Sequence, residues 1–140
     1  MRLLLDTNVF LDLPERRPGF QNSQKIILLL GRAHEGWVAW HTLSNVFYIA
    51  ERLTRSRIIA RELVHDILVW CTVVPVDHSD ALRAENLLID DFEDALQMAA
   101  ALSVDVDVII TRDLKDYQNS PIPPLTPEQF LQLHHPELLG

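Results

Sequence analysis

The sequence predicts an α/β fold in which helices flank a central parallel sheet of four to five strands. Short apolar runs typical of buried strands alternate along the chain with segments whose apolar residues recur at helical spacing. Such alternation indicates parallel strands joined by helical crossovers. The chain has 140 residues and shows no repeat, low-complexity tract or linker, so we expect one domain over residues 1–140.

The N-terminal half should supply two strands and three helices. The expected elements are strands at 3–5 and 37–40, and helices at 21–34, 43–53 and 57–70. Gly36 is a stop signal after the first helix. In the third helix, Ile58 and Ile67 are among the residues expected on the inner face. Residues 14–19, which include proline and glycine, are expected to form a loop.

The C-terminal half continues the pattern. The expected elements are strands at 72–74 and 106–110, helices at 80–88 and 91–102, and a final helix. Pro75 ends the first of these strands, and the proline-rich residues 120–124 are expected to form a loop. Thr126 suits the N-cap of the final helix, with Pro127 at the first helical position and Gln129 closing a capping box.

Composition excludes several classes of protein. The formal net charge of −8 argues against coating nucleic acid through overall charge, although it leaves a local basic groove open. The single cysteine, Cys71, excludes an internal disulfide, and its apolar neighbours indicate an inert core thiol in a reducing cytoplasm. No signal peptide is evident, and no uncharged run reaches the ~18 residues of a membrane span. The six histidines lack the spacing of zinc ligands.

Acidic residues from three parts of the chain fall at one edge of the predicted sheet. Asp6 directly follows the first strand, and Asp113 follows the fourth strand, with Asp116 one turn later. Asp91 and Asp94 begin the helix before that strand and share one helix face. The carboxyl ends of parallel strands and the N-terminus of that helix lie at the same edge, so these acids should gather there.

Gathered carboxylates need compensation. Two carboxylates about 5 Å apart repel by roughly 3 kcal/mol at an effective dielectric of ~20. Oxygen-only ligands favour Mg²⁺ or Mn²⁺, and the usual chemistry of such a site is metal-assisted attack of water on a phosphodiester. Ordinary roles stay open for Asp91 and Asp94 as acids that cap a helix, and for Asp113 and Asp116 as turn residues. Asp6 is harder to explain in this way, because a carboxylate that ends a buried strand is costly.

Three motifs in this order resemble the PIN domain, a family of metal-dependent ribonucleases that includes the toxins of many bacterial toxin–antitoxin pairs. The motifs are LLDTNV at 4–9, DFEDAL at 91–96, and VIITRD at 108–113 followed by KDY at 115–117. Any one of them alone is weak evidence, but together they span nearly the whole chain.

The resemblance implies a three-layer PIN-like fold with a pocket of about four acids that holds Mg²⁺ or Mn²⁺. It assigns catalytic and metal-binding roles to Asp6, Asp94 and Asp113, to which we add Asp116 and Asp91 as further metal ligands and Thr111 and Asn8 as supporting residues. It implies an endoribonuclease that hydrolyses RNA phosphodiester bonds as the toxin of a type II toxin–antitoxin system. The implied partners are RNA, an antitoxin and a second copy of the chain.

One position departs from the family pattern. The family usually carries a glutamate on the helix after the second strand, and the matching residue here is Asn45, a supporting residue without charge. Glu51 lies six residues on, about 240° around the helix, and faces the wrong way. His41 would share the face of Asn45. The departure predicts weak activity or a pocket that works with three acids, because one lost group near a metal can cost on the order of 10–100-fold.

Two clusters of arginines are candidates for binding the phosphates of RNA. A cluster surrounds the turn at 54–57 and a second pair lies at 16–17; these residues are Arg52, Arg55, Arg57, Arg61, Arg16 and Arg17. The alternative is a solvated helix face, because Glu51 and Glu62 lie nearby.

Two rival functions remain. A haloacid-dehalogenase-type phosphatase also ends a strand on an acid, but it needs Asp-x-Asp where this chain has Asp6-Thr7-Asn8. A degenerate PIN fold that binds RNA or a partner protein without cleavage is supported by Asn45. A covalent aspartyl phosphate would identify the first rival, and metal affinity together with cleavage would separate the second from a nuclease.

Overall fold

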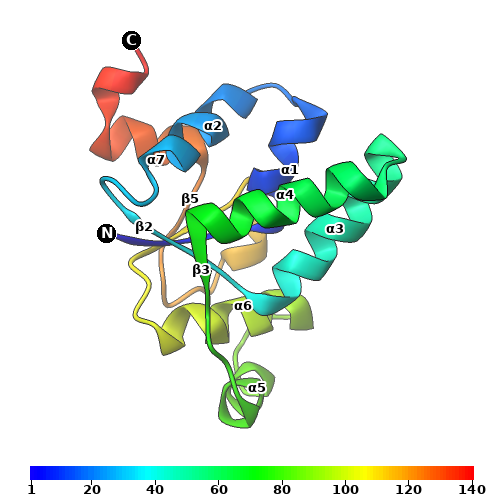
Figure 1. The fold of residues 1–140 in the computed structure, drawn as a ribbon. Helices are drawn as coiled ribbons and strands as arrows, with labels where there is room; N and C mark the ends of the chain where they lie inside the picture. The colour runs from blue at the N-terminus through cyan, green and yellow to red at the C-terminus, as the bar shows by residue number, and fades with distance from the viewer.

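The middle layer of the protein is a five-stranded parallel sheet, as seen in a computed structural model that describes residues 1–140 (Figure 1). The strand order is β3-β2-β1-β4-β5, and every neighbouring pair is parallel. The strands are β1 Arg2–Leu5, β2 Glu35–Val38, β3 Cys71–Val73, β4 Val108–Ile110 and β5 Pro124–Leu125. The predicted α/β fold class, with a parallel sheet of four to five strands, is confirmed.

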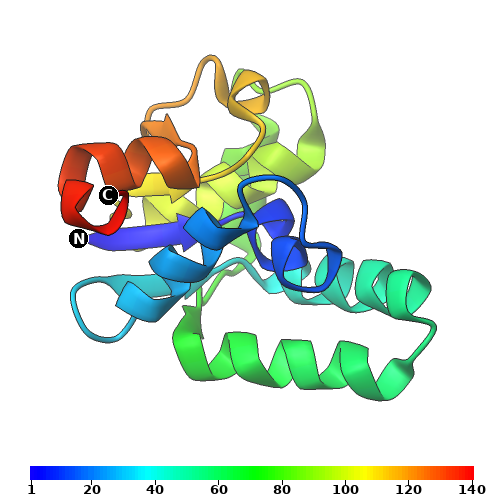
Figure 2. The same cartoon turned by 90° about the horizontal axis from the view of Figure 1, so that it is seen from above.

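Helices cover both faces of the sheet (Figure 2). One face is packed by α1, α2, α3, α4 and α7, while α6 covers the other face and α5 packs against α6. The helices are α1 Thr7–Glu15, α2 Phe20–Leu29, α3 Trp40–Thr54, α4 Arg57–Trp70, α5 His78–Glu85, α6 Phe92–Ser103, α7 Pro127–His134 and the 3₁₀ turns η1 Leu114–Tyr117 and η2 Pro136–Leu138. None of these helices is long and apolar enough to cross a membrane.

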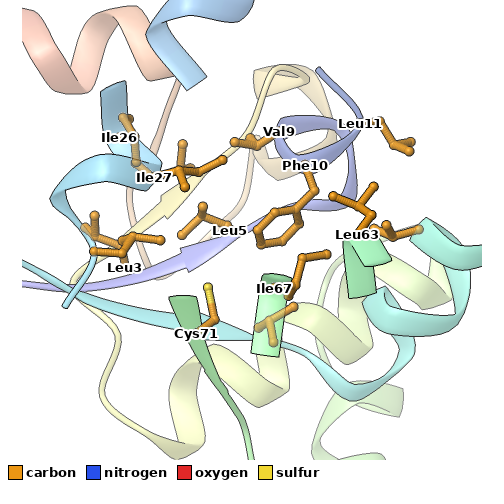
Figure 3. Packing of buried hydrophobic residues seen from close by; sticks show 14 of the residues in the cluster. Leu3, Leu5, Val9, Phe10, Leu11, Ile26, Ile27, Leu63, Ile67 and Cys71 are labelled. Atoms are coloured by element: carbon orange, nitrogen blue, oxygen red, sulfur yellow. The ribbon is translucent and has the colours of Figure 1, made fainter. Parts of the chain in front are cut away.

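Alternate side chains of β1 enter two separate cores. Leu3 and Leu5 pack with Phe10 and other residues of the helices on one face (Figure 3), and Leu4 packs with Met98 of α6 on the other face. All three leucines are fully buried, and each buried leucine side chain stabilises the fold by about 1.5–3 kcal/mol. The strand is therefore fixed in register, and the next residue in the chain lies at the carboxyl edge of the sheet.

The close approach of β2 to the end of α4 requires a glycine. A Cβ atom added at Gly36 would lie 2.9 Å from the Trp70 carbonyl oxygen and 3.0 Å from the Cys71 sulfur. Gly36 lies within β2, whereas the sequence suggested that it stops a helix at 21–34; that helix, α2, already ends at Leu29. Cys71 is buried in the core, as predicted, and burial raises the pKa of its thiol to about 12. The thiol stays protonated at neutral pH and is unreactive.

The structure also corrects expected boundaries elsewhere in the chain. The predicted loop at 14–19 begins too early, because α1 continues through Pro14 to Glu15 before Arg16 adopts a left-handed conformation. The predicted strand at 37–40 begins and ends too late, since Trp40 already starts α3. The predicted loop at 120–124 runs into the short edge strand β5, where a proline is tolerated because an edge strand lacks one partner.

The hairpin of α3 and α4 extends beyond the sheet (Figures 1 and 2). Ile67, near the sheet, is fully buried, whereas Ile58 at the tip is 72% exposed. The prediction that Ile58 lies on the inner face was wrong, because this part of α4 has no sheet beneath it.

Candidate active site

Asp6 lies between β1 and α1, and its carboxylate accepts four hydrogen bonds. The Oδ1 atom accepts from the Thr7 backbone N–H at 2.8 Å and from Gln97 Nε2 at 2.9 Å. The Oδ2 atom accepts from Thr111 Oγ1 at 2.8 Å and from the Tyr117 hydroxyl at 3.2 Å. These donors belong to α1, α6, the end of β4 and η1, and they offset the cost of a carboxylate that is partly removed from water.

Gln97 and Tyr117 form a second row of polar groups behind Asp6. Gln97 Nε2 also donates to the Tyr117 hydroxyl at 2.7 Å, and Gln97 Oε1 accepts from Thr42 Oγ1 at 3.1 Å. Burial raises the pKa of Tyr117 far above its usual range, so the phenol stays protonated and can donate a hydrogen bond to Asp6. Sequence reasoning missed both residues. The available signal was spacing, since Gln97 lies one helical turn after Asp94 on the same face.

Thr111 connects Asp6 to the loop after β4. Its Oγ1 atom accepts from the Asp113 backbone N–H at 3.1 Å and from Asn8 Nδ2 at 3.4 Å. Asn8 Oδ1 in turn accepts from the Arg112 backbone N–H at 3.1 Å. This chain of hydrogen bonds fixes the backbone on both sides of the site, whereas the Asp113 side chain is exposed at the start of η1 and caps no N–H group.

Asp12 forms a buried ionic cluster beneath this loop. The Asp12 side chain is 0% exposed and accepts from Arg112 Nη1 at 2.6 Å, Arg17 Nε at 3.1 Å and Ser23 Oγ at 2.5 Å. Arg112 also donates to the Pro18 carbonyl at 2.7 Å. The cluster joins α1, α2 and the loop after β4. Sequence reasoning missed this cluster because α1 was not predicted. Without that helix, nothing indicated that the Asp12 side chain points into the protein.

Asp94 lies among other acids at the start of α6. Asp91 is the N-cap of this helix and accepts from the Asp94 backbone N–H at 3.0 Å. Burial, together with the negative charges of Asp91, Asp116 and Asp6, raises the pKa of Asp94 to about 7. Partial burial and the charge of Asp113 also raise the pKa of Asp116. Asp91, Asp94 and Asp116 line a hollow of about 210 Å³, with Lys115 as its only basic side chain.

Asn45 of α3 contacts an acid in the first turn of α6. Its Nδ2 atom donates to Glu93 Oε1 at 2.5 Å, and Glu93 directly precedes Asp94. His41, one turn earlier on α3, is half-buried; burial lowers its pKa, while the charges of Glu93 and Asp6 act in the opposite direction. The structure thus places the acid Glu93 beside Asn45.

The donors at this edge suit a hard divalent cation in their chemistry. Carboxylates from the end of β1, the start of α6 and η1 lie close enough for their charges to act on one another, and oxygen ligands are those that Mg²⁺ and Mn²⁺ prefer. The structure contains no group of three acidic, histidine or cysteine side chains that is arranged to hold a metal ion. Binding one ion would therefore require side-chain movement.

The arginines expected to bind RNA lie away from these acids. Arg52, Arg55 and Arg57 surround the tip of the α3–α4 hairpin, whereas Thr42 at the opposite end of α3 contacts Gln97. Twelve residues of helix separate Thr42 from Thr54, which corresponds to about 18 Å at 1.5 Å per residue. Arg57 is 3.8 Å from Glu51 in an exposed ion pair. In the second predicted cluster, which consists of Arg16 and Arg17, Arg17 forms ion pairs with Asp12 and Glu15.

Comparison with known proteins identifies the architecture. A family model described as PIN domain matches residues 2–115. A search of curated proteins finds no match.

Solved structures share the fold at low sequence identity. A toxin–antitoxin complex from Klebsiella pneumoniae contains a chain that is 20% identical, with a TM-score of 0.68 over 89% of this chain and 97% of that chain. VapBC2 from Rickettsia felis, bound to a DNA fragment from its promoter, gives 13% identity and a TM-score of 0.66 over 90% and 98%. VapBC-1 from nontypeable Haemophilus influenzae gives 16% identity and a TM-score of 0.66 over 91% and 99%.

Proposed function

Because this chain belongs to the PIN domain family, we propose that it is a divalent-metal-dependent endoribonuclease that acts as the toxin of a toxin–antitoxin pair. The observation that carries the proposal is the meeting of carboxylates from three separate segments at the carboxyl edge of the sheet, around Asp6 and Asp94. Neither helix capping nor turn formation requires these segments to meet.

In the proposed site, Asp6, Asp94 and Asp113 would hold the cation, with Asp116 and Asp91 as further ligands. A bound Mg²⁺ or Mn²⁺ supplies Lewis-acid chemistry that polarises the phosphodiester and activates water. The protein orients the first ligand, because Thr111 and Gln97 fix the two oxygens of Asp6. Tyr117 stays protonated and donates a hydrogen bond to Asp6, so this hydroxyl holds the carboxylate in place and does not act as a base.

Affinity for Mn²⁺ should rise about tenfold between pH 6 and pH 8. If binding needs ionised Asp94, whose pKa is about 7 without metal, the ionised fraction grows from roughly one tenth to roughly nine tenths over this range. Isothermal titration calorimetry at the two pH values measures the change. The Asp94→Asn variant should bind weakly with little pH dependence, and equal wild-type affinity at both pH values would contradict the prediction.

The proposed partners follow from the same assignment. The solved neighbours named above include toxin–antitoxin complexes, and this supports an antitoxin as a partner. A net charge of −8 favours a partner segment with basic side chains that can enter the acidic edge. We also propose a homodimer and a cytoplasmic location. Exposed apolar residues of α4, among them Ile58, Ile59, Leu68 and Val69, provide surface for protein contacts.

Incubation of purified protein with labelled single-stranded and structured RNA tests the activity. Cleavage should occur with Mg²⁺ or Mn²⁺, stop with EDTA, and fall by at least about 100-fold in an Asp6→Asn variant. This variant is suitable because asparagine also serves as a helix N-cap and can keep the bond from Thr7. Cleavage by the wild type that persists in EDTA, or equal cleavage by wild type and Asp6→Asn purified in the same way, would contradict the proposal.

A second function is favoured by one observation, the uncharged Asn45 at the usual glutamate position. A chain that binds RNA or a partner without cleavage would be folded, would bind RNA in a mobility-shift assay, and would cleave it with no metal. Restored cleavage in an Asn45→Glu variant would then identify Asn45 as the cause.

A further inference from the structure

Glu93 is placed where the site lacks a carboxylate on α3. It lies in the first turn of α6, and its Oε1 atom accepts from Asn45 Nδ2 at 2.5 Å. Its second oxygen, Oε2, accepts no hydrogen bond from the protein, and no basic side chain pairs with it. The side chain is exposed and its free oxygen is available to a ligand.

We propose that Glu93, oriented by Asn45, supplies the carboxylate toward the divalent cation that other family members supply from α3. This inference rests on the proposed function. The two roles are divided between two helices: the acid stands on α6, and the amide that orients it stands on α3. The number of carboxylates at the edge is thereby kept, although the sequence motif has lost its glutamate.

Charge and geometry agree with this division of roles. Glu93 directly precedes Asp94 in the first turn of α6, and its bond from Asn45 turns its carboxylate toward α3. Its charge acts on His41 of α3, on which the charge of Asp6 also acts. A glutamate at position 45 would face Glu93 with a like charge, whereas an amide donates a hydrogen bond to it. Asn45 is therefore the residue type that fits an acid at position 93.

An ordinary explanation makes a different prediction. Acids are favoured in the first turn of any helix because they complement the helix dipole. Glu128 provides the matched control, since it lies in the first turn of α7, which is not part of the acidic edge. A dipole effect alone would make Glu93→Gln and Glu128→Gln equivalent in metal binding.

Titration of the full chain with Mn²⁺, followed by calorimetry and by the metal-induced shift in melting temperature, tests the inference. Glu93→Gln should weaken Mn²⁺ affinity about 10-fold or more, and Glu128→Gln should leave it within about 2-fold of wild type. Glutamine has the shape of glutamate, and circular dichroism checks that each variant is folded. The double variant Asn45→Glu with Glu93→Gln, which moves the acid back to α3, should recover most of the lost affinity.

The outcomes separate the two proposals. Wild-type-like Mn²⁺ affinity in Glu93→Gln, together with loss of binding in Asp6→Asn, would overturn the role of Glu93 alone. Failure of the double variant to regain affinity would overturn the division of roles between positions 45 and 93. A wild-type chain that binds no Mn²⁺ would overturn both the metal centre and the inference built on it.

Discussion

Replacing Asp94 by asparagine should make the metal-free protein more stable at pH 8 while removing the proposed nuclease activity. The pKa of this carboxyl is about 7 in the folded protein, compared with an ordinary value of 3.8, so the folded state binds the proton more tightly than the unfolded state. The stability that the group contributes is complete below pH ~4 and is lost as the pH rises through ~7. Because Asp94 is half-exposed, solvent screening reduces the effect, and we expect a gain of about 1–2 kcal/mol.

Urea denaturation in EDTA at pH 8 and pH 4 measures this gain, which should disappear at the lower pH. The same variant should lose the stabilisation that Mn²⁺ gives to the wild type, and its cleavage rate should fall by at least about 100-fold. Asp66→Asn is the matched control, because Asp66 is an exposed aspartate on α4 with no ion pair or hydrogen bond through its side chain. Lower stability of Asp94→Asn than of wild type at pH 8 would contradict the electrostatic explanation.

Replacing Asp12 by alanine should destabilise the protein by about 3 kcal/mol, which corresponds to a fall of roughly 10 °C in melting temperature. The change removes a fully buried acceptor of bonds from Arg17, Arg112 and Ser23. The two arginines keep part of their hydration, so the cost lies at the lower end of the range for a broken buried pair.

A thermal melt of Asp12→Ala beside the control Asp66→Ala tests the prediction, and a double-mutant cycle with Arg112→Ala isolates the pairwise term. A loss of less than about 2 °C would mean that the buried pair only offsets its own desolvation. The variant should also weaken Mn²⁺ binding, because Arg112 holds the loop that carries Asp113.

Much of the fold was predictable because local patterns and packing agree. Residues 3–5 are apolar on both faces, and a strand covered by helices on both sides needs that composition. The capping box from Thr126 to Gln129 forms both of its expected hydrogen bonds. By contrast, Pro14 suggested a loop, because a proline inside a helix removes a backbone hydrogen bond, yet α1 continues through it to Glu15. Strand β5 is too short to show a pattern.

The site was predictable where topology alone decides position. Asp6 and the residues after β4 reach one edge because parallel strands end there. Gln97, Tyr117 and Asp12 were not predictable, because a buried polar residue depends on partners that only the folded chain brings together. The contact between Asn45 and Glu93 likewise joins residues that are 48 positions apart.

The four hydrogen bonds of Asp6 have a consequence for the folding of the chain. Their donors come from segments that span residues 7–117, and the late contacts have sequence separations of 91, 105 and 111 residues. Such long loops close late in folding, since closing them costs entropy before they gain contacts. The arrangement around Asp6 therefore exists only after η1 and α6 have docked. A nascent or partly opened chain lacks it, so the proposed nuclease activity should require complete folding.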